Sequence, residues 1–135
     1  MHALIIAGGM PPKKNLLEKE MATAQLNIGA DSGGYVYLGY GHKPDIVVGD
    51  LDSFIYTHHK GIKVLKLPDQ ETNDLEKSLE YALKKGAKSV CILGATGKRF
   101  DHSLKNLSVL LKYLDRFEDI RFKDNHGELF LVRSP

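Results

Sequence analysis

Short apolar runs alternate with helical patterns along most of the chain, and the runs end at glycine or aspartate residues. The sequence predicts strands at 3–7, 26–30, 45–49 and 89–93, with a weaker, edge-like strand at 62–67. It predicts helices at 11–24, 32–38, 74–85 and 101–114. Alternation of buried strands with helices is typical of a parallel α/β sheet. We therefore expect a Rossmann-like, open and mostly parallel sheet with helices on both faces.

The two longest predicted helices carry apolar stripes. Leucine and alanine fall at 75, 79, 82 and 83 in one helix, and leucine falls at 104, 107, 111 and 114 in the other. This spacing is typical of a face that packs on a core. Asn73 is placed to cap the first of these helices, with Glu76 completing a capping box.

The last part of the chain has a different pattern. Residues 120–123 and 128–132 flank Asp-Asn-His-Gly at 124–127, which predicts an antiparallel hairpin. We expect an α/β domain over 1–116 and a hairpin tail over 117–135. The exposed edges of an incomplete hairpin invite pairing with another chain, so we expect a homodimer.

Composition excludes several classes of protein. The 19 Lys and Arg residues against 17 Asp and Glu give a net charge of +2, too small to indicate a nucleic-acid or membrane surface. No apolar run approaches the roughly 20 residues that span a bilayer. Cys91 is the only cysteine, so an intramolecular disulfide is impossible. These features are typical of a cytoplasmic protein.

Carboxylates gather where the predicted strands end. Asp50 and Asp52 follow one strand, and residues two apart in a strand point to the same side. Two such charges are costly together unless a cation lies between them, and Mg²⁺ prefers such oxygen ligands. The alternative is a solvated turn, and the pair alone favours neither. Asp31 and Asp74 are expected at the same sheet edge, which favours the metal site.

Asp69 and Asp74 lie on either side of a predicted helix start. Asp74 is the stronger candidate for the site, because side chains in a first helical turn point back toward the ends of the strands. The alternative is that Asp69 ends a turn and Asp74 offsets the helix dipole.

A glycine-rich segment, Gly-Ala-Thr-Gly-Lys-Arg at 94–99, separates the last strong strand from its helix. Glycines permit close approach of phosphate, a helix N-terminus favours an anion, and Arg99 can clamp a phosphate in bidentate fashion. The spacing is not that of a Walker A motif. The alternative is a tight turn, with Asp101 and His102 only beginning the helix.

Taken together, four segments resemble the catalytic domain of thiamine pyrophosphokinase over about residues 3–115. The segments are ADSGG at 30–34, PDIVVGDLDS at 44–53, DQETNDLEK at 69–77 and GATGKRFDH at 94–102, followed by Asn106. Each segment alone is weak, whereas their combined order and spacing is specific. Two positions depart from the family pattern: Asn73 stands where threonine is usual, and Lys98 where a small residue is common.

The resemblance implies an enzyme that transfers a diphosphate group from ATP to the hydroxyl of thiamine, with Mg²⁺, and releases AMP. It implies that Asp50, Asp52 and Asp74 hold Mg²⁺ and that Asp31 belongs to the same catalytic cluster. It places Gln70 and Asp69 near thiamine. On the nucleotide side it implies Thr96, Gly97, Arg99, Asp101, His102 and Asn106. Members of the family also carry a C-terminal β domain that completes the thiamine pocket across a dimer, and the hairpin tail is expected to be its start or remnant.

Two alternatives to this function stay open. The first is the same reaction with another alcohol, such as a hydroxymethylpterin. The second is a nucleotide-binding module without turnover.

Overall fold

The strands form one seven-stranded sheet, with the order β4-β3-β2-β1-β5-β6-β7. The computed structural model describes residues 1–52, 54, 61–69 and 71–129. The strands are β1 (His2–Ile6), β2 (Leu26–Ala30), β3 (Ile46–Gly49), β4 (Val64–Lys66), β5 (Ser89–Leu93), β6 (Asp119–Asp124) and β7 (Gly127–Leu129). The helices are α1 (Lys14–Met21), α2 (Gly33–Gly39), α3 (Asp74–Lys84) and α4 (Phe100–Tyr113).

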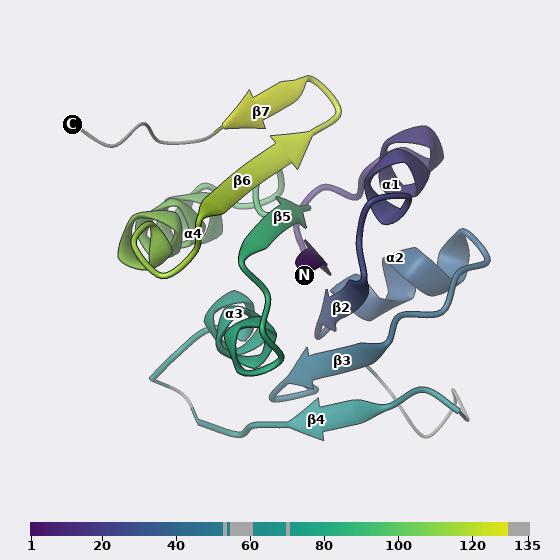
Figure 1. Ribbon diagram of the computed structural model, residues 1–135, viewed down its shortest axis with the longest axis horizontal. Helices are drawn as coiled ribbons and strands as arrows, with labels where there is room; N and C mark the ends of the chain where they lie inside the picture. The colour runs from purple at the N-terminus through teal and green to yellow at the C-terminus, as the bar shows by residue number, and fades with distance from the viewer. Residues whose placement is uncertain (53, 55–60, 70, 130–135) are drawn as a thin grey trace.

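Helices cover both faces of the sheet, with α1 and α2 on one side and α3 and α4 on the other (Figure 1). Successive side chains of a strand point to opposite faces, so β1 contributes to two cores. Ile5 packs with Leu79 of α3 and Leu110 of α4 in one cluster. Leu4 packs with Leu17 and other residues of α1 and α2 in the second. The predicted Rossmann-like α/β fold is confirmed.

The tail is joined to the main sheet. The hairpin is confirmed, because β6 and β7 pair in antiparallel fashion. However, β6 also pairs in parallel with β5, with Val90 opposite Ile120 and Ile92 opposite Phe122. Helix α4 is therefore a crossover between two parallel strands of one sheet. The division into domains at residues 116 and 117 stays a prediction.

The packing face of α4 agrees with the expected one in part, since Leu107 and Leu114 pack against the core. The helix buries Val109, Leu110 and Tyr113, whereas Leu104 and Leu111 are 51% and 58% exposed. Apolar residues on α4 form two neighbouring stripes, and the spacing alone does not show which of them faces the sheet. Contacts made by Tyr113 determine which face of α4 packs on the sheet. This residue packs in the core, and its hydroxyl donates a hydrogen bond to Glu80 of α3 at 2.7 Å.

The start of α3 agrees with the sequence more closely. Leu75, Leu79 and Ala82 are buried, and Asn73 Oδ1 accepts a hydrogen bond from the Glu76 N–H at 2.8 Å. The carboxylate of Glu76 pairs with Lys112 of α4 at 2.7 Å rather than completing a capping box.

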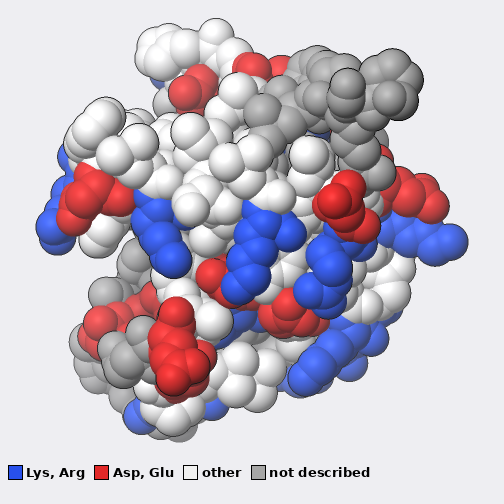
Figure 2. Space-filling model, turned by 90° about the vertical axis from the view of Figure 1, so that its left-hand side faces the viewer, with Lys and Arg blue, Asp and Glu red and all other residues white. Residues whose placement is uncertain are grey.

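Charged side chains of both signs intermix on the face formed by α3 and α4 (Figure 2). The ion pairs Lys112–Glu76 and Arg116–Glu80 join the two helices there. Among the described residues, no helix combines the length and apolar character that crossing a bilayer requires.

Candidate nucleotide and metal site

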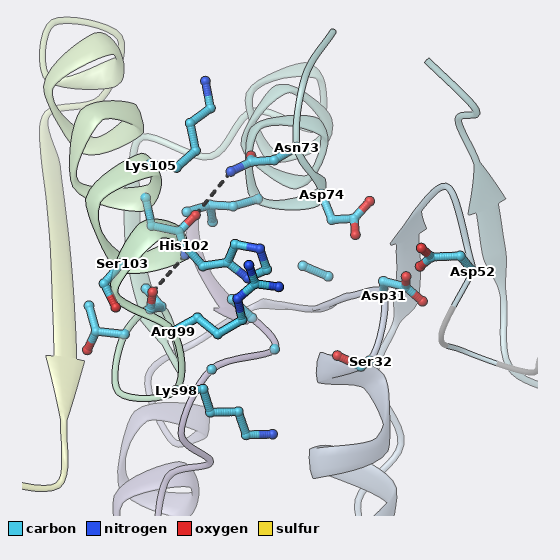
Figure 3. A pocket seen from close by; sticks show the side chains of 18 residues that line it. Asp31, Ser32, Asp52, Asn73, Asp74, Lys98, Arg99, His102, Ser103 and Lys105 are labelled. Carbon is cyan, nitrogen blue, oxygen red and sulfur yellow. Dashed lines mark hydrogen bonds between the residues drawn. The ribbon is translucent and has the colours of Figure 1, made fainter. Parts of the chain in front are cut away.

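Four carboxylates converge at one edge of the sheet. Asp31 follows β2, Asp50 and Asp52 follow β3, and Asp74 begins α3. One oxygen from each lies within 4.8 Å of the corresponding oxygen of the others. Figure 3 shows Asp31, Asp52 and Asp74 pointing toward a common space. The structure therefore brings together the cluster that the sequence predicted.

The turn after β3, rather than the strand itself, brings Asp50 and Asp52 together. The strand ends at Gly49, and Leu51 has a left-handed backbone with φ of 60°. The N–H of Asp52 donates to Asp50 Oδ1 at 3.2 Å, and the N–H of Asp50 donates to Asp74 Oδ1 at 3.1 Å. The expected juxtaposition is correct, but strand alternation is the wrong reason for it.

Asp31 is more buried than the other three carboxylates. It is only 3% exposed and has a left-handed backbone, with φ of 47°. Its Oδ1 accepts a hydrogen bond from the N–H of Phe54 at 2.6 Å. The carboxylate therefore holds the chain that follows the β3 turn.

Gly49 makes room for the Asp74 carboxylate. A Cβ at this position would lie 2.5 Å from Asp74 Oδ1, and the φ of Gly49 is 148°. Both the space and the backbone conformation therefore require glycine. The Asp74 carboxylate therefore lies directly against the backbone of Gly49.

Electrostatics within the cluster favour a bound cation. Burial raises the pKa of Asp74, and the charges of Asp50 and Asp52 raise it further, against the N–H of Asp50 and the charge of Lys77. A divalent cation among these oxygens would relieve the repulsion. Hard carboxylate oxygens with a glycine backbone behind them fit Mg²⁺.

Opposite the carboxylates lies a positively charged wall. A cavity of about 610 Å³ is lined on one side by Asp31, Asp52 and Asp74. The cations Lys98, Arg99 and Lys105, together with the His102 side chain, line its other side (Figure 3). All four lie in or just before the start of α4, where unpaired backbone N–H groups favour an anion. Gly9 forms part of the lining, and a Cβ there would lie 2.4 Å from the carbonyl oxygen of Gly94. The cavity therefore has room for a phosphate chain between the cations and the carboxylate cluster.

The predicted nucleotide residues divide into two groups. Thr96, Arg99, His102 and Asn106 line the cavity, whereas Gly97 and Asp101 do not belong to its lining. Asp101 instead accepts from the Arg99 guanidinium, with 2.8 Å between Oδ2 and Nη2. A phosphate bound by Arg99 would compete with this ion pair. The roles of all six residues in ATP binding stay predictions.

Asn106 links the two sides of the cavity. Its Oδ1 accepts from Asn73 Nδ2 at 3.1 Å, and its Nδ2 donates to the carbonyl oxygen of Ala95 at 2.7 Å. Asn73, one residue before Asp74, is thereby joined to the end of β5 (Figure 3). The departure from the family pattern at position 73 thus supplies an amide donor.

The residues expected near thiamine lie in the segment between β4 and α3. The side chain of Asp69 is exposed and accepts from the N–H of Glu71 and the hydroxyl of Thr72, both at 2.8 Å. Lys77 donates to the backbone carbonyl of Asp69. Asp69 does not line the large cavity, and Gln70 lies outside the described residues. The substrate roles of both stay predictions.

Sequence reasoning missed three polar residues of the cavity, namely Ser32, Ser103 and Lys105. Ser103 follows Arg99 by four residues and Lys105 follows His102 by three, so helical periodicity could have identified them. Ser32 lies against the loop that follows β1, since a Cβ on Gly8 would lie 2.5 Å from the Ser32 Oγ. Nothing in the local sequence indicates that contact.

Comparison with known families agrees with this site. The sequence model of the family described as "Thiamin pyrophosphokinase, catalytic domain" matches residues 17–123. The chain belongs to this family. The match includes all four carboxylates and the cationic wall, so the resemblance seen in the sequence is confirmed.

Similar proteins carry the same family name. Thiamine pyrophosphokinase of Bacillus subtilis (strain 168) is 32% identical over 136 residues, which cover 93% of this chain and 63% of that protein. Thiamin pyrophosphokinase 1 of Caenorhabditis elegans is 35% identical over 96 residues, which cover 66% of this chain and 40% of that protein. The chain thus spans less than two thirds of these relatives.

Solved structures show the same fold. Thiamin pyrophosphokinase from Geobacillus thermodenitrificans superposes with a TM-score of 0.74 at 27% identity, covering 92% of this chain and 60% of that one. The yeast thiamin pyrophosphokinase gives a TM-score of 0.76 at 14% identity, covering 91% of this chain and 58% of that one. The yeast comparison bears on the fold alone.

Proposed function

We propose that the chain catalyses transfer of a diphosphate group from ATP to the hydroxyl of thiamine, with Mg²⁺, giving thiamine diphosphate and AMP. One observation carries the proposal: Asp31, Asp52 and Asp74, three of the four clustered carboxylates, face a cationic wall across a single cavity in a member of the thiamin pyrophosphokinase family. This is the charge pattern that phosphoryl-type transfer requires, since the reaction depends on alignment and charge neutralisation.

Asp50, Asp52 and Asp74 would hold Mg²⁺, with Asp31 in the same cluster. The ion would neutralise charge on the diphosphate as it moves. Lys98, Arg99 and Lys105 attract and orient the phosphates from the opposite wall. Gly8 and Gly9 line the cavity on the sheet side.

The transfer requires a proton acceptor. The thiamine hydroxyl oxygen attacks the β-phosphorus, the bond from that phosphorus to the α,β-bridging oxygen breaks, and AMP departs with that oxygen. The hydroxyl proton passes to a carboxylate of the cluster, Asp31 or Asp74.

The test is incubation of the purified chain with Mg-ATP and thiamine, followed by mass spectrometry of the products. We expect AMP and thiamine diphosphate in equal amounts, with neither formed when EDTA removes the metal. Asp52→Asn is the matched inactive variant. Product from a hydroxymethylpterin but not from thiamine would favour the alternative acceptor.

Binding measurements separate the remaining outcomes. Mg²⁺-dependent ATP binding without turnover on either alcohol would favour a nucleotide-binding module. Absence of both binding and turnover would contradict the proposal.

We also propose that the chain forms a homodimer. Phe100, Leu104 and Leu111 expose apolar surface along α4, and β7 lies at the edge of the sheet. Exposed strand edges and apolar surface favour association. Light scattering coupled to gel filtration tests this, and a single monomer mass across the accessible concentration range would contradict it.

A further inference from the structure

Two asparagine amides connect the segment after β5 to the start of α3. Asn106 Nδ2 donates to the carbonyl oxygen of Ala95 at 2.7 Å, and Asn106 Oδ1 accepts from Asn73 Nδ2 at 3.1 Å (Figure 3). Asn73 Oδ1 in turn accepts from the N–H of Glu76 at 2.8 Å. These bonds form one continuous series from Ala95 to Glu76, which we call the amide bridge.

Backbone groups at both ends fix the orientation of the two amides. A carbonyl oxygen can only accept, so the nitrogen of Asn106 must face Ala95 and its oxygen must face Asn73. A backbone N–H can only donate, so the oxygen of Asn73 must face Glu76 and its nitrogen must face Asn106. Turning either amide over would place two donors or two acceptors together. The amide bridge therefore has one arrangement, which sets the distance between its ends.

The Ala95 end of the amide bridge lies in the segment that leads from β5 to the positively charged wall. The carbonyl oxygen of Gly94 accepts from the Gly9 N–H at 2.6 Å, and that of Thr96 accepts from the Met10 N–H at 2.8 Å. The loop after β1 therefore holds this segment from one side, and the amide bridge holds it from the other. A shift at Ala95 would move the start of the positively charged wall.

The Asn73 end lies beside the carboxylate cluster. Asp74 follows Asn73 directly and begins α3, and its Oδ1 accepts from the N–H of Asp50 at 3.1 Å. A displacement of Asn73 would therefore move the Asp74 carboxylate relative to Asp50. The amide bridge thus joins two groups of residues that line opposite sides of the cavity.

Other contacts between α3 and α4 do not depend on the amide bridge. The Glu76 carboxylate pairs with Lys112, and Glu80 pairs with Arg116 and accepts from the Tyr113 hydroxyl. Loss of the amide bridge should therefore leave the two helices packed together. It should loosen only the parts of α3 and α4 that lie next to the cavity.

We propose that Asn73 and Asn106 are positioning residues that set the distance between the carboxylate cluster and the positively charged wall. The inference rests on the proposed function for the reaction that this distance serves. Diphosphate transfer requires the phosphates to be aligned between the two sides of the cavity, and a misplacement of about 1 Å can cost roughly 100-fold in rate. Asn106 acts in this reaction through Asn73 and Ala95.

Asn73→Ser separates the amide bridge from the helix cap. Serine is as good an N-cap as asparagine, so the bond from the Glu76 N–H is kept. The serine hydroxyl oxygen lies one bond closer to the backbone than the amide nitrogen, so it does not reach Asn106. Asn106→Ala removes the other half of the amide bridge. Asn15→Ser is the matched control, because Asn15 Oδ1 accepts from the Leu16 N–H at 2.9 Å and Asn15 does not line the cavity.

The experiment measures formation of thiamine diphosphate at varied Mg-ATP for the parent, the single variants, the double variant and the control, with urea unfolding to verify folding. We expect kcat to fall at least about tenfold in Asn73→Ser and in Asn106→Ala, while KM for Mg-ATP changes less than about threefold. The double variant should be no slower than the slower single variant, because both substitutions remove the same interaction. Asn15→Ser should match the parent.

Three results would overturn the positioning role. These are a parental kcat in Asn73→Ser, a loss that appears only in KM, and losses that multiply in the double variant.

Complete absence of turnover by the parent would instead contradict the proposed function. NMR of the Asn106 side-chain amide then tests the amide bridge by itself. Its signal should shift when Mg²⁺ is added to the parent, because the carboxylate cluster is coupled to Asn106 through Asn73, and it should not shift in Asn73→Ser. An equal response in the two proteins would overturn the inference.

Discussion

Replacing Gly49 with alanine should damage both the fold and the proposed metal site. The φ of 148° belongs to a region occupied almost only by glycine, and forcing another residue into it costs about 1–3 kcal/mol. The new Cβ would also lie 2.5 Å from Asp74 Oδ1 and 2.9 Å from its Cγ. Ordinary carbon contacts are about 3.5–4.0 Å, so the carboxylate must move away by roughly 1 Å. That movement would take Asp74 out of the cluster.

Two measurements test this expectation. Urea unfolding should show a loss of about 1–3 kcal/mol in the free energy of unfolding. Titration of the folded variant with Mg²⁺, followed by calorimetry, should show that specific binding is lost. Gly39→Ala is the control, because its Cβ meets nothing within 4 Å. Alanine at a helical position should leave stability unchanged or raise it by up to about 1 kcal/mol. If Gly49→Ala matches the parent in both stability and Mg²⁺ affinity, the reasoning is wrong.

Three further predictions concern other parts of the chain. Asp52→Asn should abolish Mg²⁺-dependent ATP binding in calorimetry yet keep the urea midpoint, because its side chain is exposed; retained binding would remove the metal-site argument. Glu20→Gln should lower the free energy of unfolding at neutral pH by about 1–3 kcal/mol, because it breaks a charged pair with Lys123 that is largely buried on the glutamate side. Burial opposes ionisation of Glu20, but the pair with Lys123 brings its pKa below the ordinary 4.5. The stability difference should therefore be full above pH 4.5 and shrink as the pH falls through the lowered pKa; a constant difference in urea unfolding across this range would contradict the pairing. Burial and the charge of Glu20 raise the pKa of Cys91, so iodoacetamide should label this thiol in urea but not in the native protein.

The periodicity of apolar residues, together with the glycine or aspartate residues that follow the strands, was enough to predict where the main elements lie. β2 and β5 begin and end where the apolar runs do, and α3 begins at Asp74. These elements depend on local properties, namely apolar alternation, a cap at Asn73 and glycine or aspartate after each strand. Because the carboxyl ends of parallel strands meet at one edge, the convergence of the four carboxylates also followed from the order of elements.

Packing decided what the sequence left open. The sequence predicted one apolar stripe on α4, and contacts with the sheet and α3 bury Leu110 and Tyr113 beside it. Pairing of β6 with β5 made the tail part of the main sheet, although its local pattern indicated only a hairpin.

The finer geometry of the site is also a tertiary result. The turn at Leu51, the bond from Asn73 to Asn106 and the ion pair between Arg99 and Asp101 depend on the positions of whole elements or on side-chain rotamers. Residue types and their spacing thus determined which chemistry the chain carries. The three-dimensional packing determined which oxygen faces which donor, because that depends on distances between segments far apart in the sequence.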